Sequence, residues 1–523
     1  MINRFPTKRV LIVNCYFDPL RIPVQRKFKI PPSITPAYLA GVFSSRHCHI
    51  RLYDEVYSGP MEDERLAAFP DMLVLTGLNA ALDRMRHITA YVKTKTPKAI
   101  VVAGGPAIRA LYHYSRQFFD YSCRGDLEQL AGIVEDEFGP EYVSEDFLEH
   151  GWIMPRLDLV YWTKIITHVE SSRYCYYRCS YCSLTAEKGS YRPYDLEYLR
   201  RQIMALGPNQ LLNFLDNNFC SNNRAFMRRR FELLKELRAR GYICKWGAEV
   251  TCDFFFDDET LALAVESGCG GLFCGLESFD DQTLAGYRKQ QNLCLPQIEL
   301  IQKSLRANIP FHYGIVFDFS TRTIDQLEAE WRYILATPEI PLPSFITLAI
   351  PLLKTPLFYE CLENKLFLPH LRLRDLDGDT ITLKPRNRLA HVVQFMDDVK
   401  TLRGYKLKVL NHIDKFRRYY KNILSIRNMA LSQYGAFLIS APRVSTLQVR
   451  PSKAMPNPLG PVQRTFVGSQ ARLDSTYRPA FAIDAKYLHY FQPTQLTDGE
   501  GAICEALQPD LLPSGPLGTS SFS

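Results

Sequence analysis

Three closely spaced cysteines carry the clearest chemical signal in this sequence. Cys175, Cys179 and Cys182 stand at positions i, i+4 and i+7. Thiolates with this spacing on a tight loop can bind three corners of one metal cluster and leave the fourth metal without a protein ligand. Because substrates and co-substrates bind at open metal positions, the spacing indicates chemistry as well as stability. A closed zinc site is the alternative, but its fourth ligand is missing, since Cys220 and His312 stand at no ligand-like spacing.

Carboxylates end three apolar runs downstream of the cysteines. Asp216, Glu249 and Glu277 each close a short strand-like run, and helical stretches separate the runs. Alternating strands and helices predict a parallel sheet or partial barrel, with ligands bound beyond the carboxyl ends of the strands. Any one of these acids alone is more typical of a solvated strand end. Three in succession, opening toward one cysteine loop, favour a ligand site.

The cysteine motif resembles the signature of radical S-adenosylmethionine enzymes, including the aromatic Tyr181 just before the last cysteine. In that family the three thiolates hold a 4Fe–4S cluster, and the unique iron chelates the amino and carboxylate groups of S-adenosylmethionine. The resemblance therefore implies that Cys175, Cys179 and Cys182 are metal ligands. Carboxylates at the strand ends can accept hydrogen bonds from the ammonium group and the ribose hydroxyls. The residues implied for this co-substrate are Tyr181, Asp216, Asn217, Glu249, Glu277 and Ser278.

The first 135 residues or so show a strand–helix alternation of their own. This pattern predicts a doubly wound open sheet, which binds ligands at the carboxyl ends of its strands. Glycine-containing turns follow three of these strands, and glycine lets the backbone approach a large ligand closely. No GxGxxG follows the first strand, so a nicotinamide dinucleotide site is not expected. The predicted strands are residues 9–14, 49–54, 71–77, 99–104 and 118–123.

This N-terminal region looks like the cobalamin-binding domain that precedes the radical domain in one large branch of the family. Many cobalamin proteins coordinate cobalt through a histidine in a D-x-H-x-x-G turn after the first strand. Here that turn is Asn14-Cys-Tyr-Phe-Asp18, so we expect no histidine beneath cobalt. The alternative is a structural or vestigial sheet. The cobalamin contacts implied by the resemblance are Thr76, Asn79, Gly104, Gly105, Gly125, Asp126 and Glu128.

The predicted fold class is α/β. We expect an N-terminal doubly wound, Rossmann-like cobalamin-binding domain at residues 8–138, and a linker at 139–168. A partial (β/α)6 TIM-like radical barrel follows at 169–365, then a mainly helical or irregular C-terminal extension at 366–440. Residues 441–523, rich in Pro, Arg, Ser and Gln, predict an irregular, partly disordered tail.

The barrel has further sequence markers. Helices are predicted at about 193–206, 222–240 and 257–268, and the last two of six strands at 313–318 and 345–351. The family typically continues from its last strand with Pro-x-Pro-Gly-Thr-Pro. Here Lys354 replaces the glycine, which affects the expected substrate-facing turn rather than the fold.

Composition limits the remaining possibilities. The 523 residues are 46% apolar and 23% charged, as in ordinary soluble chains, and the net charge of +8 is mild. No secretory or membrane-spanning stretch is evident, so the 14 cysteines are expected to be reduced in the cytoplasm. The basic run at 227–230 indicates the solvated face of a helix. The run at 415–421 mixes aromatic and basic residues and is weak evidence for nucleic acid, which we do not expect as a partner. The other 11 cysteines show no second cluster spacing, unlike the methylthiotransferases of tRNA and ribosomal protein.

The leading functional hypothesis is a cobalamin-dependent radical S-adenosylmethionine methyltransferase. As the resemblance implies, a 5′-deoxyadenosyl radical removes a hydrogen from an unactivated carbon of a small molecule, which then receives the methyl group of methylcobalamin. An electron donor such as flavodoxin or ferredoxin would reduce the cluster. Alternatives are a rearrangement or cyclisation with the same cofactors, a radical enzyme with a vestigial N-terminal domain, and a non-catalytic sensor. The strand-end carboxylates argue against a sensor, and the sequence identifies neither the substrate nor the residues that act on it.

Overall fold

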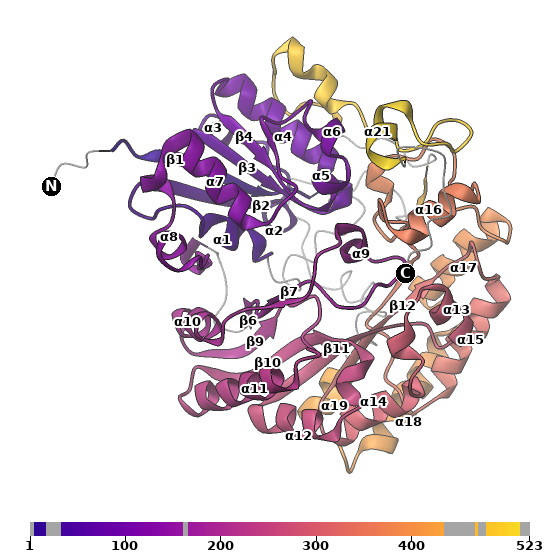
Figure 1. The fold of residues 1–523 in the computed structure, drawn as a ribbon. Helices are drawn as coiled ribbons and strands as arrows, with labels where there is room; N and C mark the ends of the chain where they lie inside the picture. Colours follow the sequence, from indigo (N-terminus) through magenta and orange to yellow (C-terminus); the bar gives the residue numbers. More distant parts are fainter. Residues whose placement is uncertain (1–4, 17–32, 160–165, 434–465, 469–476, 513–523) are drawn as a thin grey trace, which may run out of the picture. The chain divides into compact units, whose positions relative to one another are not determined.

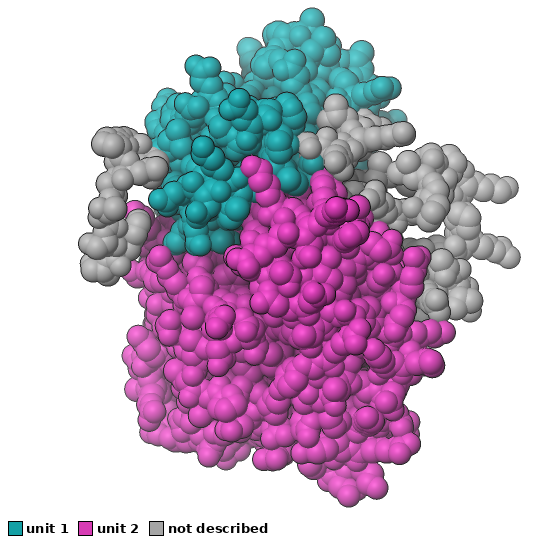
Figure 2. Space-filling model, turned by 90° about the vertical axis from the view of Figure 1, so that its right-hand side faces the viewer, with its two compact units in different colours: residues 1–162, 351–377, 468–523 teal, residues 163–350, 378–467 magenta. Residues whose placement is uncertain are grey.

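The computed structural model describes residues 5–16, 33–159, 166–433, 466–468 and 477–512. The chain forms two compact units, coloured separately in Figure 2. The first comprises residues 1–162, 351–377 and 468–523, and the second comprises residues 163–350 and 378–467. Each unit is therefore built from separate stretches of chain, whereas each predicted domain is continuous. The predicted domain limits stay a prediction.

The first unit contains a five-stranded parallel sheet in the order β2-β1-β3-β4-β5 (Figure 1). Because β1 lies between β2 and β3, the strand order reverses between β1 and β3, and open α/β sheets bind ligands at such a switch point. All five predicted strands are present, with small shifts at their ends. Their bounds are β1 Lys8–Asn14, β2 Cys48–Asp54, β3 Met72–Thr76, β4 Ile100–Ala103 and β5 Tyr121–Ser122.

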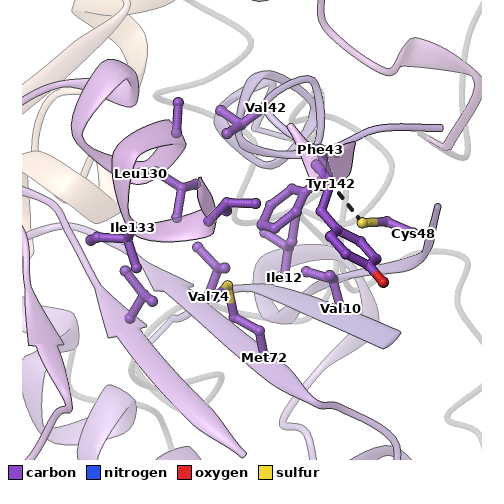
Figure 3. Close-up of a cluster of buried hydrophobic side chains, with 14 of the residues drawn as sticks. Val10, Ile12, Val42, Phe43, Cys48, Met72, Val74, Leu130, Ile133 and Tyr142 are labelled. Atoms are coloured by element: carbon purple, nitrogen blue, oxygen red, sulfur yellow. Dashed lines mark hydrogen bonds between the residues drawn. The ribbon is translucent and has the colours of Figure 1, made fainter. Parts of the chain in front are cut away.

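Helices bury this sheet because its strands are apolar on both faces. Side chains of β1 and β3, such as Ile12 and Val74, pack against Leu130 and Ile133 of helix α7, as Figure 3 shows. The bounds of the helices that follow the strands are α1 Thr35–Ala40, α4 Leu82–Lys95, α5 Pro106–Ala110 and α7 Leu127–Phe138.

Residues 477–512, within the predicted irregular tail, pack against α4 in this first unit. Asp83 is buried and accepts hydrogen bonds from Thr494 N at 3.1 and 3.0 Å and from Tyr477 Oη at 3.0 Å. The segment consists mainly of short turns and 3-10 helices, including η10 Ala485–Phe491. The end of the predicted tail, residues 513–523, lies outside the described part of the chain.

The second unit contains a curled six-stranded parallel sheet in the order β13-β12-β11-β10-β9-β6. Sequential order with a helix after most strands is the arrangement of half a (β/α) barrel. The first strand, β6, overlaps the end of the range predicted as linker, residues 139–168. The strand has only four residues, and the sequence did not predict it. The strands are β6 Ile166–Val169, β9 Asn209–Phe214, β10 Ile243–Val250, β11 Cys269–Glu277, β12 Phe311–Phe317 and β13 Phe345–Leu348.

Large buried side chains cover one face of this sheet. Trp246 is fully buried and packs against Phe219 and against Phe231 of α11. On the opposite face Gly314 lies directly beneath the ring of Phe345. The predicted helices are confirmed as α10, α11 and α12. The helix bounds are α10 Leu196–Leu206, α11 Arg224–Ala239, α12 Asp258–Ser267, α13 Asp281–Gly286, α14 Gln297–Arg306 and α15 Ile324–Ala336.

The C-terminal extension is shared between the two units. Residues 366–377 of the extension belong to the first unit and residues 378–440 to the second. The helices of the extension are α17 Leu389–Thr401, α18 Lys406–Tyr420 and α19 Ile426–Ser432. Helix α16 Pro356–Glu363, which precedes the extension, belongs to the first unit. Helix α18 packs on α15 through His412, whose Nδ1 lies 3.3 Å from Leu335 O. No helix in the described part of the chain is both long and apolar enough to cross a membrane.

Candidate functional site

The cysteine segment is a loop between two short antiparallel strands, β7 Ser172–Arg173 and β8 Arg192–Pro193. Cys175 and Cys179 are buried, and Cys182 is half-buried at the start of α9 Ser183–Glu187. Burial, together with the charges of the other two thiols, raises the pKa of Cys182 to about 11. Crowded, buried thiols of this kind ionise when they bind a metal, whose positive charge offsets both effects.

The donor set of this loop fits an iron–sulfur cluster. Over the residues that the structure describes, no three Cys, His, Asp or Glu side chains converge closely enough to hold one metal ion. The cysteines of a 4Fe–4S cluster bind different irons and surround a larger body than a single ion. Three thiolates would hold three irons of such a cluster and leave the fourth iron open.

Side-chain amides contact two of the three sulfurs. Asn218 Nδ2 donates to Cys175 Sγ at 3.7 Å, and Gln291 Nε2 donates to Cys179 Sγ at 3.6 Å. Neither residue was among the predicted site residues. Asn218 belongs to the polar run after β9, and this run could have indicated it as a site residue. Nothing in the sequence indicated Gln291.

Asp216 and Asn217 bind the stretch of chain that leads into the cysteine loop. The Asp216 carboxylate accepts from Ser171 N at 2.7 Å and from Ser172 Oγ at 2.6 Å. It also lies 3.5 Å from the Arg230 guanidinium, and both side chains are fully buried. Asn217 Oδ1 accepts from Tyr174 N at 3.1 Å. Both predicted co-substrate residues are thus occupied by hydrogen bonds from the loop that carries the cysteines.

Glu277 and Tyr181 meet at a buried lysine. Lys289 Nζ donates to Glu277 Oε1 at 2.7 Å and to Tyr181 Oη at 2.8 Å, and Tyr181 Oη donates to Glu277 Oε1 at 2.9 Å. Although burial opposes the charge of Lys289, the Glu277 carboxylate raises the pKa of that lysine. A side chain at Gly275 would collide with this group, since its Cβ would lie 2.7 Å from Glu277 Oε1. Lys289 was not predicted, because its place depends on how residues 286–292 fold back onto the loop.

Glu249 and Ser278 differ sharply in accessibility. The Glu249 side chain is exposed and has no hydrogen-bond or ion partner within the described ranges, yet nearby protein removes enough water to raise its pKa. Ser278 is fully buried, and its hydroxyl donates to Glu330 Oε1 at 2.7 Å. Asp216, Glu249 and Glu277 all lie at the carboxyl ends of adjacent parallel strands, as the sequence predicts. Of these three carboxylates, Glu249 has its oxygens open to a ligand.

The predicted cobalamin residues of the first sheet also gather at strand carboxyl ends. Gly105 has a φ of +114°, and a Cβ there would lie 2.6 Å from Gly77 O, so the Gly104–Gly105 turn packs tightly on the turn after β3. A Cβ at Gly104 would have only Cys123 Cβ within 4 Å, at 3.8 Å. Asn79 is buried, and its Oδ1 has no hydrogen-bond partner in the described part of the structure.

The remaining predicted residues are more closely engaged or more exposed. Thr76 ends β3, and its carbonyl accepts from Cys15 N at 2.7 Å. Asp126 pairs with Arg109 at 2.7 Å, and the same guanidinium donates to Gly125 O at 3.1 Å, whereas Glu128 is exposed. An open glycine turn and an unsatisfied buried acceptor fit a flat corrinoid that carries amide donors. Residues 17 and 18 of the turn without histidine lie outside the described residues.

Lys354 replaces the glycine expected after the last barrel strand, and it adopts a φ of +63°. This is the left-handed region that glycine adopts without strain. The turn therefore keeps the backbone geometry typical of glycine while it presents a lysine. Burial lowers the pKa of this lysine.

No protein-family model matches the chain. It is 24% identical over 347 residues to the hopanoid C-2 methylase of Rhodopseudomonas palustris, which covers 63% of this chain and 64% of that protein. It is 25% identical over 262 residues to the bacteriochlorophyllide d C-12(1)-methyltransferase of Chlorobaculum tepidum, covering 49% and 52%. The matches thus span less than two thirds of each of these curated relatives.

Solved structures share the fold. The radical S-adenosylmethionine methyltransferase TsrM from Kitasatospora setae, with cobalamin and a 4Fe–4S cluster bound, aligns with a TM-score of 0.50 and 14% identity over 69% of this chain and 75% of its own. The cobalamin-dependent radical enzyme OxsB, with aqua-cobalamin and S-adenosylmethionine bound, aligns with a TM-score of 0.53 and 14% identity over 86% and 74%. These comparisons confirm the resemblance to cobalamin-dependent radical S-adenosylmethionine enzymes and the α/β fold with parallel sheets.

Proposed function

We propose that this chain is a cobalamin-dependent radical S-adenosylmethionine methyltransferase that methylates an unactivated carbon of a small molecule. The observation that carries the proposal is the cysteine loop. Hydrogen bonds to Asp216 and Asn217 hold this loop at the carboxyl end of a strand of the half-barrel. Methyltransferases among the relatives support methylation over a rearrangement or cyclisation with the same cofactors. When bound, the cluster and S-adenosylmethionine supply radical chemistry, and cobalamin supplies the methyl group.

In this proposal the chain's own residues hold and orient the cofactors. Cys175, Cys179 and Cys182 ligate three irons. Asp216 fixes the start of the loop, because its carboxylate accepts hydrogen bonds from Ser171 and Ser172, which precede the cysteines. The open carboxylate of Glu249 accepts hydrogen bonds from the ammonium or hydroxyl groups of S-adenosylmethionine. Glu277 lies beside the loop in a fixed orientation, because Lys289 and Tyr181 both bind its Oε1.

The first unit would bind the corrinoid at the switch point of its sheet, ahead of the radical barrel in the sequence. The Gly104–Gly105 turn gives a floor without side chains, and Asn79 Oδ1 offers an acceptor to a corrinoid amide. No histidine of the turn after β1 reaches cobalt, since the sequence has none there. A low-potential donor such as flavodoxin or ferredoxin would deliver the electron, and a reducing cytoplasm suits the free cysteines.

Iron content tests the cluster directly. Anaerobically reconstituted protein should hold about four irons per chain, and Cys179→Ala should lose them. Cys220→Ala is the matched control, because Cys220 is also buried and follows a neighbouring strand but contacts Asp253 instead, at 3.5 Å. A Cys179→Ala protein that keeps its iron and still cleaves S-adenosylmethionine would refute the cluster assignment.

Corrinoid retention tests the first unit. Hydroxocobalamin should travel with the wild-type protein through gel filtration, and Gly104→Trp should release it by filling the floor of the site. Gly104 is better suited to this test than Gly105, because any side chain at Gly105 would strain the backbone. A loss of corrinoid in a Gly105 variant could then result from misfolding. Gly132→Trp, at an exposed glycine with nothing within 4 Å of its Cβ, is the control. A colourless wild-type protein that still turns over substrate would leave the sheet as a scaffold.

Methyl transfer itself is tested with host extracts. Anaerobic incubation with S-adenosylmethionine, cobalamin and reductant should yield a product heavier by one methyl group in place of hydrogen, and methyl-labelled S-adenosylmethionine should pass its label to that product. A product of unchanged mass would favour rearrangement or cyclisation instead.

A further inference from the structure

Residues 286–292 form a clasp between the cysteine loop and the half-barrel. On the loop side, Ser180 N donates to Tyr287 O at 2.9 Å. On the barrel side, Asn292 Nδ2 donates to Leu276 O at 3.0 Å. Because both ends of the clasp are hydrogen-bonded, the side chain just before Asn292 has a fixed place against the loop.

That side chain is Gln291, and it has a counterpart on the other side of the loop. Gln291 is 3% exposed and donates to Cys179 Sγ, while Asn218 is fully buried and donates to Cys175 Sγ. Water cannot compete for these sulfurs at such burial. Two of the three cysteine sulfurs therefore carry a neutral N–H donor placed by the fold.

We propose that Gln291 and Asn218 raise the reduction potential of the 4Fe–4S cluster through their amide hydrogen bonds to Cys179 and Cys175. The inference rests on the proposed function. Reduction adds one electron from a low-potential one-electron donor, and the added negative charge spreads onto the cysteine sulfurs. An N–H donor stabilises the more negative, reduced form more than the oxidised form, so it favours electron uptake.

Redox titration of the reconstituted protein, followed by electron paramagnetic resonance of the reduced cluster, tests the proposal. Gln291→Met roughly keeps the length of the side chain and replaces its amide by a thioether that cannot donate a hydrogen bond. At a fixed solution potential, the ratio of reduced to oxidised cluster should fall by about tenfold, which is 59 mV for a one-electron couple. The neighbouring Gln290→Met is the matched control, because Gln290 is exposed and should leave the ratio unchanged.

An unchanged ratio in Gln291→Met, with the full iron content, would overturn the inference while leaving the proposed function intact. A wild-type protein that binds no cluster would instead refute the proposed function. If Gln291→Met fails to hold iron, wild-type protein labelled with 15N at the glutamine side chains decides the question. A 15N coupling to the reduced cluster supports the hydrogen bond to Cys179, and the absence of any such coupling refutes it.

Discussion

Asp216 provides the sharpest test of whether a strand-end carboxylate serves the fold or a ligand. Its side chain and that of Arg230 are both fully buried, and the two groups lie 3.5 Å apart. Replacing Asp216 by Asn keeps the shape but leaves the guanidinium without its counter-charge. Removing one partner of a buried ion pair costs about 3–5 kcal/mol. For a unit of a few hundred residues, this loss lowers the melting temperature by roughly 10 °C.

The assay is thermal or urea unfolding of the apo-protein, measured without any cofactor. Glu249→Gln is the matched control, because Glu249 is exposed and has no partner within the described residues, so its loss should change stability by no more than about 0.5 kcal/mol. Adding Arg230→Met to Asp216→Asn should recover part of the lost stability, since the uncompensated charge is then gone. An Asp216→Asn protein as stable as wild type, but unable to bind S-adenosylmethionine, would refute the structural role and favour a ligand role.

Further predictions concern other parts of the molecule. Burial lowers the pKa of His168 from 6.5 to about 4. Between these two values the unfolded chain binds a proton that the folded chain does not, so the free energy of unfolding should fall by up to about 3 kcal/mol as the pH drops from 6.5 to 4. His168→Gln should flatten this part of the stability–pH profile, and an unchanged profile would contradict the argument. Gly314→Val should cost about 1 kcal/mol in chemical unfolding, because a Cβ at Gly314 would lie 2.3 Å from the Phe345 ring and would disrupt its stacking on Phe273; Gly286→Ala, at a glycine with nothing within 4 Å of its Cβ, is the control. Deleting residues 477–523 should destabilise the first unit and increase proteolysis near α4, because it removes the hydrogen bonds to buried Asp83, whereas equal protection of the shortened chain would show that the segment is dispensable.

Much of the fold follows from local sequence patterns. Apolar runs such as Val10–Val13 predict strands because their side chains are buried on both faces of a parallel sheet. Strand β6 was missed because four residues that include Thr167 and His168 carry little strand signal. The packing of residues 477–512 was equally hidden, since it depends on contacts between Asp83 and two residues that lie 394 and 411 positions later, Tyr477 and Thr494.

The candidate site also contains residues that local sequence patterns predict and residues that only the folded chain brings together. Cysteine spacing is local, so the motif could be found from the sequence. Gln291 and Lys289 could not, because they reach the loop only after residues 286–292 fold back across β11. Their side chains have no spacing relation to the cysteines, and their roles depend on distances that only the folded chain sets.

The three strand-end carboxylates show why a sequence pattern cannot assign roles within a site. Asp216, Glu249 and Glu277 occupy equivalent positions at the ends of neighbouring strands, so the pattern treats them alike. What distinguishes them is the protein packed around each oxygen. Asp216 accepts from the loop, and Glu277 is bound by Lys289, whereas Glu249 keeps its oxygens open at a raised pKa. A carboxylate without protein donors, partly stripped of water, gains most from a ligand's ammonium or hydroxyl group. Glu249 is therefore the position at which loss of co-substrate binding should occur without loss of stability.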